Sequence, residues 1–292
     1  RHHSRRGRLG VSEPVLVIGA AGKTGRAVAR ALVARGVPVR AAVRPGREDA
    51  APPGTDPVAV DLETGAGLGA SLDGIRAVYH LAPNVHPDEV GMAARMADAA
   101  VTAGGPRVVF HSVLHPDDAR MPHHLRKGDA ETVLRSVLGD RLTVVRPAAY
   151  HQNLLDQAVG GVVMVPYSAD APFTNVDLGD VADVAATMLL AAGVGGEVHD
   201  LAGPEVLTTR AMAEQASEVL GRVVEVHEIT ISAWLRGTGA DLTDFARESL
   251  VAMFRAYDED GLVGDPDALT SLLGRAPTTW AQAVQDAAPR HP

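Results

Sequence analysis

Three glycines near the start of the chain have the spacing of a phosphate-binding loop. Gly19, Gly22 and Gly25 follow the apolar run 15–18 and precede the amphipathic stretch 26–35. Such glycines allow a tight turn after a strand, a close approach of the backbone to a pyrophosphate, and close packing of the next helix. The helix N-terminus adds unpaired N–H groups and a partial positive charge. Because the series lies between a predicted strand and a predicted helix, it predicts a dinucleotide site rather than an ordinary turn.

Basic residues at the end of the second predicted strand bear on which dinucleotide binds. An NAD-selective site usually has an acidic residue about 20 residues after the glycine loop, where it binds the ribose 2′-hydroxyl. This chain has Arg44 there, with Arg47 nearby, and a guanidinium suits a 2′-phosphate. We therefore expect NADP(H) to be the favoured cofactor. NAD(H) is the alternative, because Glu48 adjoins the two arginines and because a solvated loop arginine would give the same sequence.

The ends of the next two predicted strands supply further candidates. Asp61 and Leu62 end the third strand, where they would flank the adenine. Leu81, Ala82 and Pro83 end the fourth strand, where they would line the dinucleotide. Open α/β sheets bind ligands outside the carboxyl ends of their strands, so we expect these contacts, with a plain loop as the alternative in each case.

Short apolar runs alternate with longer amphipathic stretches through the first half of the chain. We expect strands at 15–18, 37–43, 58–60, 77–81, 107–110 and 142–145, and helices at 26–35, 89–103 and 130–138. Strand–helix–strand repetition predicts a parallel sheet with helices on both faces, and continuously apolar strands indicate that both faces are covered. The predicted fold class is α/β, a doubly wound parallel-sheet Rossmann fold.

The pattern changes after residue 147. We expect a helix at 176–192, a strand at 197–201, a helix at 208–220 capped by Thr208, and a wholly helical end. This predicts a smaller, mostly helical substrate lobe over the carboxyl ends of the strands. We divide the chain into three parts. Residues 1–12 form a tail that is disordered or left by cloning, and residues 13–150 form a dinucleotide-binding Rossmann core. Residues 151–292 contain the remaining sheet elements (about 176–202) and the substrate lobe.

Composition limits the classes of partner and chemistry. The 292 residues include 27 basic and 36 acidic side chains, a net charge of −9, and an acidic surface repels nucleic acid. No apolar run approaches the roughly 20 residues that a membrane span needs. The chain has no cysteine, which excludes disulfides and thiolate chemistry. We expect a cytoplasmic protein, monomeric or homodimeric, with a small-molecule substrate and with neither nucleic acid nor a membrane as partner.

Several ordered motifs together resemble the NmrA-like group of atypical short-chain dehydrogenases/reductases. The matching segments are 19–25, 39–44, 60–62, 111–113, 123–127 with Glu131, 143–147 with Tyr150 and Asn153, 176–182, 203–208 and 273–277. The resemblance spans about 13–285 and implies a Rossmann sheet with a small substrate lobe. It also implies an NAD(P)H-dependent reductase of quinones, ketones or phenolic compounds, or a member that binds the cofactor without turnover and acts as a redox sensor.

The glycine loop, the strand ends and the resemblance together give a set of expected cofactor contacts. They are Gly19, Ala21, Gly22, Lys23, Thr24, Gly25, Arg44, Asp61, Leu62, Leu81, Ala82, Pro83, His111, Lys127, Pro147 and Tyr150. Tyr150, His151 and Asn153 follow the sixth strand and should face the nicotinamide. We expect Tyr150 to stack on the ring or donate a proton, and His151 and Asn153 to bind substrate, with loop packing as the alternative.

The catalytic group is where the sequence departs from ordinary short-chain dehydrogenases, a departure that fits the resemblance because NmrA-like proteins commonly lack the catalytic tyrosine. Ordinary short-chain dehydrogenases use Tyr-x-x-x-Lys with a serine, and the tyrosine passes a proton to the substrate oxygen. Here Lys127 is present, His123 stands in the tyrosine position, and Ser112 falls near the usual serine. We expect Lys127 to bind the nicotinamide ribose. His123 is a candidate proton donor because an imidazole titrates near neutral pH, with an exposed loop histidine as the alternative and His124 as a competitor.

Two other classes of chemistry are disfavoured. The candidate metal ligands are spaced along a strand end and a predicted loop: His111, His115, Asp117, Asp118, His123 and His124. This spacing gives no helical face for converging metal ligands, so we expect no metal. A serine hydrolase is disfavoured because the chain has no Gly-x-Ser-x-Gly elbow.

The leading functional hypothesis is a reductase that transfers hydride to a quinone, ketone or conjugated bond of an apolar small molecule, such as an aromatic secondary metabolite. The cofactor carries this chemistry and the protein orients the reactants. Residues of the helical end are expected to form the apolar pocket wall or a helix core: Trp234, Leu235, Met253, Phe254 and Tyr257. The alternative is a non-catalytic NAD(P)-binding redox sensor, which the missing tyrosine would suit.

Overall fold

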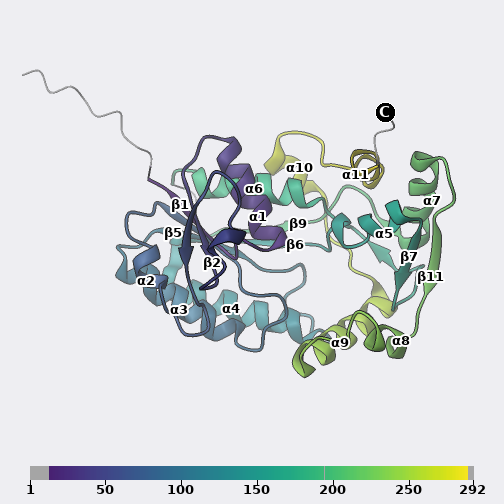
Figure 1. Ribbon diagram of the computed structural model, residues 1–292, viewed down its shortest axis with the longest axis horizontal. Helices are drawn as coiled ribbons and strands as arrows, with labels where there is room; N and C mark the ends of the chain where they lie inside the picture. The colour runs from purple at the N-terminus through teal and green to yellow at the C-terminus, as the bar shows by residue number, and fades with distance from the viewer. Residues whose placement is uncertain (1–12, 194, 289–292) are drawn as a thin grey trace, which may run out of the picture.

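The computed structural model describes residues 13–193 and 195–288, so the expected tail at 1–12 lies outside the described residues. The centre is a seven-stranded sheet in the order β3-β2-β1-β4-β5-β6-β9, and every pair in it is parallel. Figure 1 labels β1, β2, β5, β6 and β9 of this sheet. The strands are β1 (Val15–Ile18), β2 (Val39–Val43), β3 (Asp56–Ala59), β4 (Ala77–His80), β5 (Arg107–His111), β6 (Leu142–Pro147) and β9 (Val198–Leu201). The order reverses between β1 and β4, where open α/β sheets bind ligands. The predicted doubly wound Rossmann fold is confirmed.

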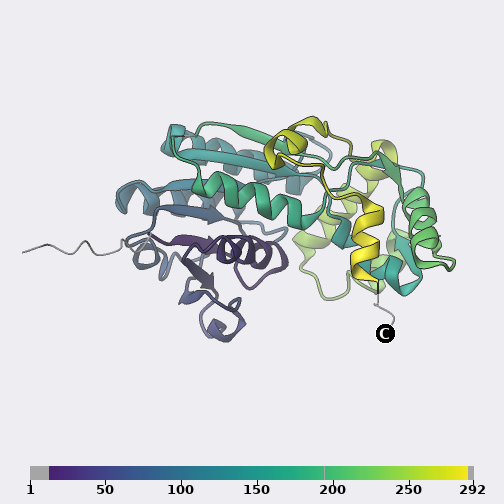
Figure 2. The same ribbon diagram turned by 90° about the horizontal axis from the view of Figure 1, so that it is seen from above.

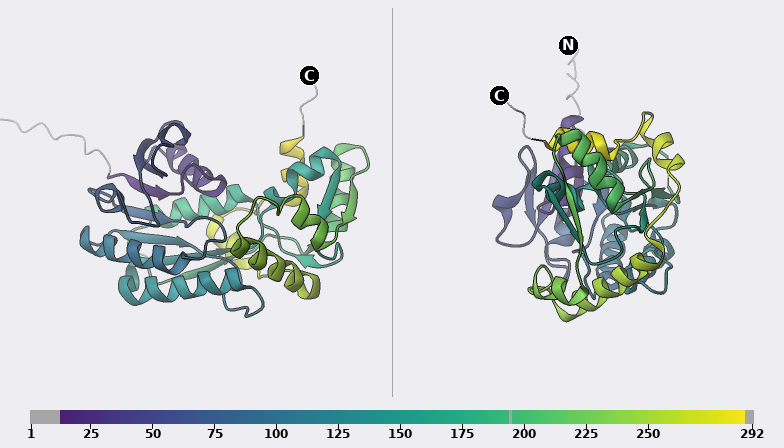
Figure 3. Two further views of the ribbon diagram at one scale, coloured as in Figure 1. Left: turned by 60° about the horizontal axis from the view of Figure 1, so that its bottom comes forward. Right: turned by 90° about the vertical axis from the view of Figure 1, so that its right-hand side faces the viewer.

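Alternate side chains of the five inner strands enter two separate cores, as the pleat of a strand requires. Val15 and Val17 of β1 pack with the helices on one face, and Leu16 and Ile18 pack with those on the other. The first face is covered by α1 (Lys23–Ala34) and α6 (Leu178–Leu190), and the second by α2 (Leu68–Ser71), α3 (Glu89–Thr102) and α4 (Pro122–Leu138). Figure 3 shows the two helical layers with the sheet between them.

The fourth helix begins eight residues earlier than the sequence pattern indicates. The predicted start at residue 130 is wrong, because α4 begins at Pro122. Proline suits the first turn of a helix, where its missing N–H would be unpaired in any case. The early turns carry His123, His124 and Lys127, which are polar yet buried. Polar residues on the inner face hide the apolar periodicity on which helix prediction depends.

The lobe at one end of the sheet mixes short strands with helices (Figure 2). β7 (Val162–Val165) pairs in parallel with β11 (Glu225–Glu228), and β8 (Pro172–Phe173) pairs antiparallel with β10 (Leu207–Thr208). None of these four strands was predicted, because two have only two residues and β11 is largely exposed and polar.

The helices of the second half extend the lobe and then return to the sheet. They are α5 (Leu155–Gly160), α7 (Thr209–Leu220), α8 (Ile231–Arg236), α9 (Asp244–Asp260), α10 (Asp267–Leu273) and α11 (Trp280–Ala287), with 3-10 turns η1 (Glu48–Ala50), η2 (Gly139–Arg141) and η3 (His151–Asn153). The predicted Thr208 cap is confirmed, since its side chain accepts from the N–H of Ala211. Trp280 of α11 is fully buried in the core of the lobe. By contrast, α10 packs on α6 and β9 of the central sheet.

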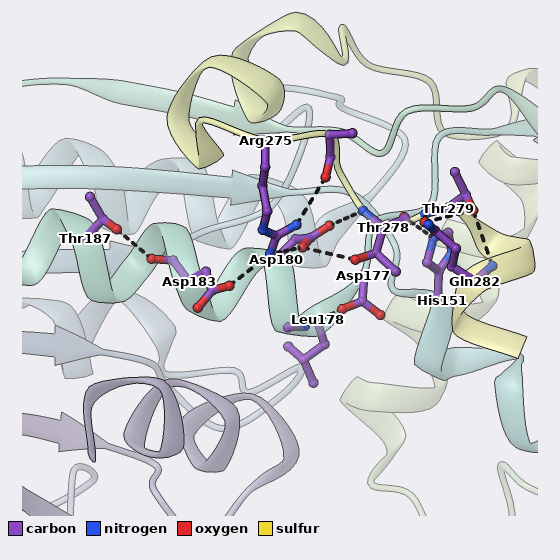
Figure 4. Close-up of polar contacts among 12 residues, drawn as sticks. His151, Asp177, Leu178, Asp180, Asp183, Thr187, Arg275, Thr278, Thr279 and Gln282 are labelled. Carbon is purple, nitrogen blue, oxygen red and sulfur yellow. Dashed lines mark hydrogen bonds and ion pairs between the residues drawn. The ribbon is translucent and has the colours of Figure 1, made fainter. Parts of the chain in front are cut away.

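A cluster of polar contacts fastens the segment between α10 and α11 to α6 (Figure 4). Asp180 is 1% exposed and accepts hydrogen bonds from the N–H of Thr278 at 2.6 Å and from its hydroxyl at 3.2 Å. Arg275 pairs with Asp180 at 2.7 Å and with Asp183 at 2.9 Å. A buried carboxylate is tolerated only where its oxygens are paired. This cluster, which we call the C-terminal latch, therefore holds the end of the chain against the core.

We expect Asp180→Asn to lower the free energy of unfolding by about 1–3 kcal/mol, because it removes a charged acceptor from a buried network. Urea unfolding at neutral pH measures the change. The control is Asp244→Asn, which alters a carboxylate that is 92% exposed and pairs with Arg247; it should cost less than about 0.5 kcal/mol. Equal losses in the two variants would contradict a structural role for the latch.

Candidate functional site

A cleft of about 880 Å³ opens at the carboxyl ends of the strands. The loops after β1 to β6 line it, together with α4 and α9. It brings together most of the residues that the sequence predicted for the site, namely Gly19, Ala21, Gly22, Lys23, Thr24, Arg44, Asp61, Leu62, Leu81, Ala82, Pro83, His111, Ser112, His123, Lys127, Pro147, Tyr150 and Asn153. Gly25 lies behind the loop, and His151 lies elsewhere.

The glycine loop has a shape that a phosphate group fits. Gly19 has a φ of +69°, which favours glycine, and a Cβ at Gly25 would lie 2.2 Å from the carbonyl oxygen of Gly19. The N-terminus of α1 has no side-chain cap and no acidic residue in its first turn. Its N–H groups and partial positive charge therefore face the cleft without a competing carboxylate.

Two arginines stand where the second strand ends. Arg44 and Arg47 both line the cleft and both are exposed. Within the described part of the chain, neither guanidinium pairs with a carboxylate; Glu48 instead accepts from the N–H of Gly46 at 3.2 Å. Both arginines can therefore turn toward an anionic group in this part of the cleft.

Asp61 ends the third strand as an ionised acceptor. Its Oδ1 accepts from the N–H groups of Glu63 at 2.8 Å and Thr64 at 3.3 Å. Hydrogen bonding from Thr64 lowers the pKa of Asp61, with a smaller contribution from Glu63. The carboxylate thus shapes the turn that borders the cleft, and its second oxygen can accept from a ligand hydroxyl.

Lys127 is a buried lysine paired with a buried glutamate. Its ammonium lies 2.8 Å from Oε1 of Glu89, the first residue of α3, and donates to the carbonyl oxygen of His111 at 3.2 Å. Lys127 is 3% exposed and Glu89 is fully buried. Neither Glu89 oxygen has a hydrogen-bond partner of good angle among the described residues, so the charge of Lys127 is what stabilises that carboxylate. An ammonium has three N–H groups, which leaves one for a ligand in the cleft.

Tyr150 is held at the cleft by groups from three other segments. Its Oη lies 2.8 Å from Nε2 of His111 and 3.4 Å from Oγ1 of Thr24. Nδ1 of His111 lies 2.5 Å from Oη of Tyr79 on β4. Burial raises the pKa of Tyr150 well above its ordinary value. Burial, and secondarily the charge of Lys127, lowers the pKa of His111 to about 3. At neutral pH the tyrosine is therefore protonated and the histidine is neutral.

His123 lies in the cleft, but not with the titration that the sequence suggested. It lies on α4 one turn before Lys127 and is 7% exposed, so the alternative of an exposed loop histidine is wrong. Burial lowers its pKa to about 3, and the charges of Lys127 and His124 add to the shift. The expectation of a pKa near neutrality is therefore also wrong. A neutral imidazole can still exchange a hydrogen bond with a ligand.

Ser112 and His151 are engaged away from the centre of the cleft. The hydroxyl of Ser112 donates to Oε1 of Glu131 at 2.5 Å, and Glu131 also holds Arg146. Its proton is thus already committed to a carboxylate. His151 is buried with its ring 5.5 Å from that of Trp280, and its Nε2 lies 3.4 Å from the carbonyl oxygen of Thr278. The structure therefore does not bring His151 to the cleft.

A lysine and an asparagine meet across the mouth of the cleft. Nζ of Lys23, at the start of α1, donates to Oδ1 of Asn153 in η3 at 2.9 Å. The same ammonium lies 5.5 Å from the centroid of the Tyr150 ring. Burial lowers the pKa of Lys23, and the charge of Asp156 partly opposes that shift. This contact joins the phosphate-facing helix to the first turn of the lobe.

One wall of the cleft is apolar. It is made by Leu250, Met253, Tyr257 and Leu262. Trp234 and Phe254 pack on each other behind this wall with ring centroids 4.8 Å apart, and Leu235 packs against the same core. Of the five apolar residues predicted for this wall, the structure thus brings Met253 and Tyr257 to the cleft and uses the others as core.

Sequence reasoning missed Tyr79, Glu89 and the aliphatic residues Leu250 and Leu262. Tyr79 lies inside an apolar strand, where a tyrosine is an ordinary core residue. Glu89 lies at the start of an amphipathic helix, where an acidic residue is usually on the surface. A tyrosine one residue before His80 and two before the cleft-lining Leu81 was the available signal for Tyr79. In the residues described, no group of three His, Asp or Glu side chains converges on a metal position, and no helix is long and apolar enough to cross a membrane.

Replacing Lys127 by methionine should leave the Glu89 carboxylate buried without a charge partner. We expect Lys127→Met to lower the free energy of unfolding by about 3–5 kcal/mol, and Lys127→Met with Glu89→Gln to recover most of that loss. Denaturant unfolding at neutral pH is the measurement. Lys23→Met is the matched control, because Lys23 lines the same cleft but bonds to the amide oxygen of Asn153 and not to a buried carboxylate. A loss in the double variant as large as in Lys127→Met would refute the pairing.

Comparison with known proteins places this cleft in a family. A family model described as the NmrA-like family matches residues 12–282. The chain is 34% identical over 227 residues to a (4-alkanoyl-5-oxo-2,5-dihydrofuran-3-yl)methyl phosphate reductase of Streptomyces griseus, covering 75% of this chain and 78% of the relative. It is 27% identical over 277 residues to an NAD(P)H azoreductase of Xenophilus azovorans, covering 92% and 96%.

The fold comparison agrees with the sequence comparison. The crystal structure of an NADPH-dependent quinone oxidoreductase of Escherichia coli, complexed with NADPH, superposes with a TM-score of 0.79 at 23% identity, covering 94% of this chain and 99% of that one. The resemblance noted in the sequence motifs is thereby confirmed, and the chain belongs to the NmrA-like family.

Proposed function

We propose that this protein is an NADPH-dependent reductase that acts on a quinone, a ketone or a conjugated carbon–carbon double bond of an apolar small molecule. The observation that carries the proposal is the composition of one cleft. Its glycine loop at the N-terminus of α1, its two exposed arginines, its buried lysine and its apolar wall all line the same cleft, and these are the kinds of group that a dinucleotide and an apolar acceptor need. When bound, the cofactor supplies the hydride.

Each part of the cleft suits one part of the cofactor. The N-terminus of α1 suits the pyrophosphate, and Arg44 with Arg47 suits a 2′-phosphate. The remaining N–H of Lys127 suits a ribose hydroxyl next to the nicotinamide. The relatives' names support the same cofactor class, because they describe an NAD(P)H azoreductase and an NADPH-dependent quinone oxidoreductase.

The substrate end favours an apolar molecule with one polar acceptor group. Leu250, Met253 and Leu262 offer aliphatic surface, and Tyr150 offers a hydroxyl. The Streptomyces griseus relative is named for a ring compound that carries an alkanoyl group and a ring carbonyl. We therefore place acyl-substituted unsaturated lactones and related conjugated carbonyl compounds first among the candidate substrates, with quinones second.

Mixing the purified protein with NADPH and an acceptor panel tests the function. The panel contains a benzoquinone, an azo dye, a conjugated cyclic ketone and an alkanoyl-substituted unsaturated lactone with and without a phosphate ester. We expect protein-dependent oxidation of NADPH with at least one of them, above a protein-free control. Tight binding of NADPH with no oxidation by any acceptor would instead favour the redox-sensor hypothesis.

Arg44→Ala tests the choice of cofactor. If Arg44 binds the 2′-phosphate, this substitution should weaken NADPH binding by about 1–3 kcal/mol, the usual cost of losing a charged hydrogen bond. NADH binding should not change. Fluorescence titration with each reduced cofactor gives both affinities. Arg30→Ala, which removes an exposed arginine of α1 that does not line the cleft, controls for net charge. Equal weakening for NADPH and NADH would remove the case for NADP selectivity.

A further inference from the structure

A chain of hydrogen bonds runs from the interior of the sheet to the cleft. It joins Oη of Tyr79 to Nδ1 of His111 at 2.5 Å, and Nε2 of His111 to Oη of Tyr150 at 2.8 Å. Tyr79 lies on β4 and His111 at the end of the neighbouring β5, while Tyr150 follows β6. Three adjacent parallel strands thus position the three side chains in one line. Tyr79 is fully buried, and only His111 and Tyr150 line the cleft.

The direction of these hydrogen bonds follows from the burial of Tyr79. Its phenol proton needs an acceptor, and Nδ1 of His111 is its one hydrogen-bond partner among the described residues. Tyr79 therefore donates to Nδ1. A neutral imidazole carries one N–H, so that hydrogen is on Nε2 and points at Oη of Tyr150. Tyr150 accepts this bond and keeps its own proton for another acceptor. The Thr24 hydroxyl, 3.4 Å away, supplies a further donor.

Other groups of the cleft are less able to deliver a proton. Ser112 already donates to Glu131, and Lys127 is paired with Glu89. His123 is neutral, and no hydrogen bond to a described residue fixes which of its ring nitrogens carries the hydrogen. Tyr150 differs from these groups, because its hydroxyl oxygen already accepts a hydrogen bond from His111. Its own proton is therefore free to be donated to a ligand in the cleft.

We propose that Tyr150 donates the proton in the reaction, that His111 is a positioning residue that holds it, and that Tyr79 fixes the tautomer of His111. This inference rests on the proposed function. When the carbonyl carbon accepts the hydride, the C=O electron pair moves onto the carbonyl oxygen. When the far carbon of a conjugated C=C bond accepts it, the C=C pair shifts to a new double bond at the carbonyl carbon, the C=O pair moves onto the oxygen, and protonation gives the enol. The O–H bond of Tyr150 breaks and a new O–H bond forms on that oxygen. The phenolate left on Tyr150 accepts hydrogen bonds from Nε2 of His111 and from Thr24 until solvent returns the proton.

The surroundings of Tyr150 suit a phenolate that exists only briefly. Burial keeps the hydroxyl protonated at rest, because it raises the pKa of Tyr150 well above its ordinary value. The ammonium of Lys23, 5.5 Å from the ring centroid, places a positive charge beside the phenolate as it forms. The neighbouring hydrogen-bond donors act in the same direction, and donors aimed at a developing charge are a large source of rate acceleration. A tyrosine after β6 can thus take the role of the tyrosine in the Tyr-x-x-x-Lys pattern of ordinary short-chain dehydrogenases, a position that His123 holds in this chain.

The first experiment compares kcat and KM for Tyr150→Phe, Tyr79→Phe and the double variant with a conjugated cyclic ketone. We expect Tyr150→Phe to lower kcat about 100-fold, as for loss of a general acid, and Tyr79→Phe to lower it about tenfold, as for loss of one orienting hydrogen bond. The KM for NADPH should not change. In the Tyr150→Phe background, Tyr79→Phe should have no further effect. Tyr167→Phe is the matched control, because Tyr167 packs among aromatic rings of the lobe and does not line the cleft.

A second measurement reads the tautomer without turnover. In protein labelled with ¹⁵N-histidine, the resonances that disappear in His111→Gln belong to His111, and we expect them to report an N–H on Nε2. Tyr79→Phe should shift that population toward Nδ1–H, whereas Tyr167→Phe should not. An Nδ1–H tautomer in the wild type would overturn the proposal. The proposal would also be overturned if the wild type is active and Tyr79→Phe leaves its kcat unchanged. The same holds if the double variant loses kcat by the product of the factors seen for Tyr150→Phe and Tyr79→Phe. Failure of the proposed function looks different, because the wild type would then reduce no acceptor.

Discussion

The close packing of α1 on the end of β1 is the contact on which the cleft depends. The 2.2 Å separation between a Cβ at Gly25 and the carbonyl oxygen of Gly19 means that any other residue would force the helix away from the strand. The first turn of that helix carries both the uncapped N–H groups that face the cleft and Thr24, whose hydroxyl reaches Tyr150. One backbone approach therefore sets the geometry at both ends of the cleft.

Local signals in the sequence predict the sheet and the positions around the cleft. Apolar runs mark the strands, and because parallel strands end at a common edge, residues such as Asp61, Leu81 and His111 could be placed together without knowing any contact. Side-chain partners could not be predicted in this way. The sequence does not say that Ser112 bonds to Glu131 rather than to a ligand, or that Tyr79 reaches His111, because both depend on the fit of elements far apart in the chain. The start of α4 was missed for a related reason, since its buried face is polar.

The polar groups beneath the cleft are not those that stability alone would favour. Glu89 and Lys127 are buried as charges, and both ring nitrogens of His80 lack a hydrogen-bond partner among the described residues. Burial lowers the pKa of His80 to about 3, so it stays neutral beside that pair. Buried ion pairs are often no more stabilising than apolar residues of the same size. Their presence under an otherwise aliphatic core indicates that the electrostatics of the cleft, and not packing, decide these residue types.

The path of the chain between the two parts constrains how the protein can assemble. β9 joins the central sheet only after residues 151–177 have passed through the lobe, and α10 returns to the sheet before Trp280 fills the core of the lobe. During synthesis from the N-terminus, the seventh strand, the latch residue Arg275 and the buried tryptophan emerge from the ribosome in that order. The sheet receives Leu269 of α10 and the lobe receives Trp280 of α11 only from this last part of the chain, so both cores are completed late in synthesis. The cleft between them is consequently among the last features of the molecule to form.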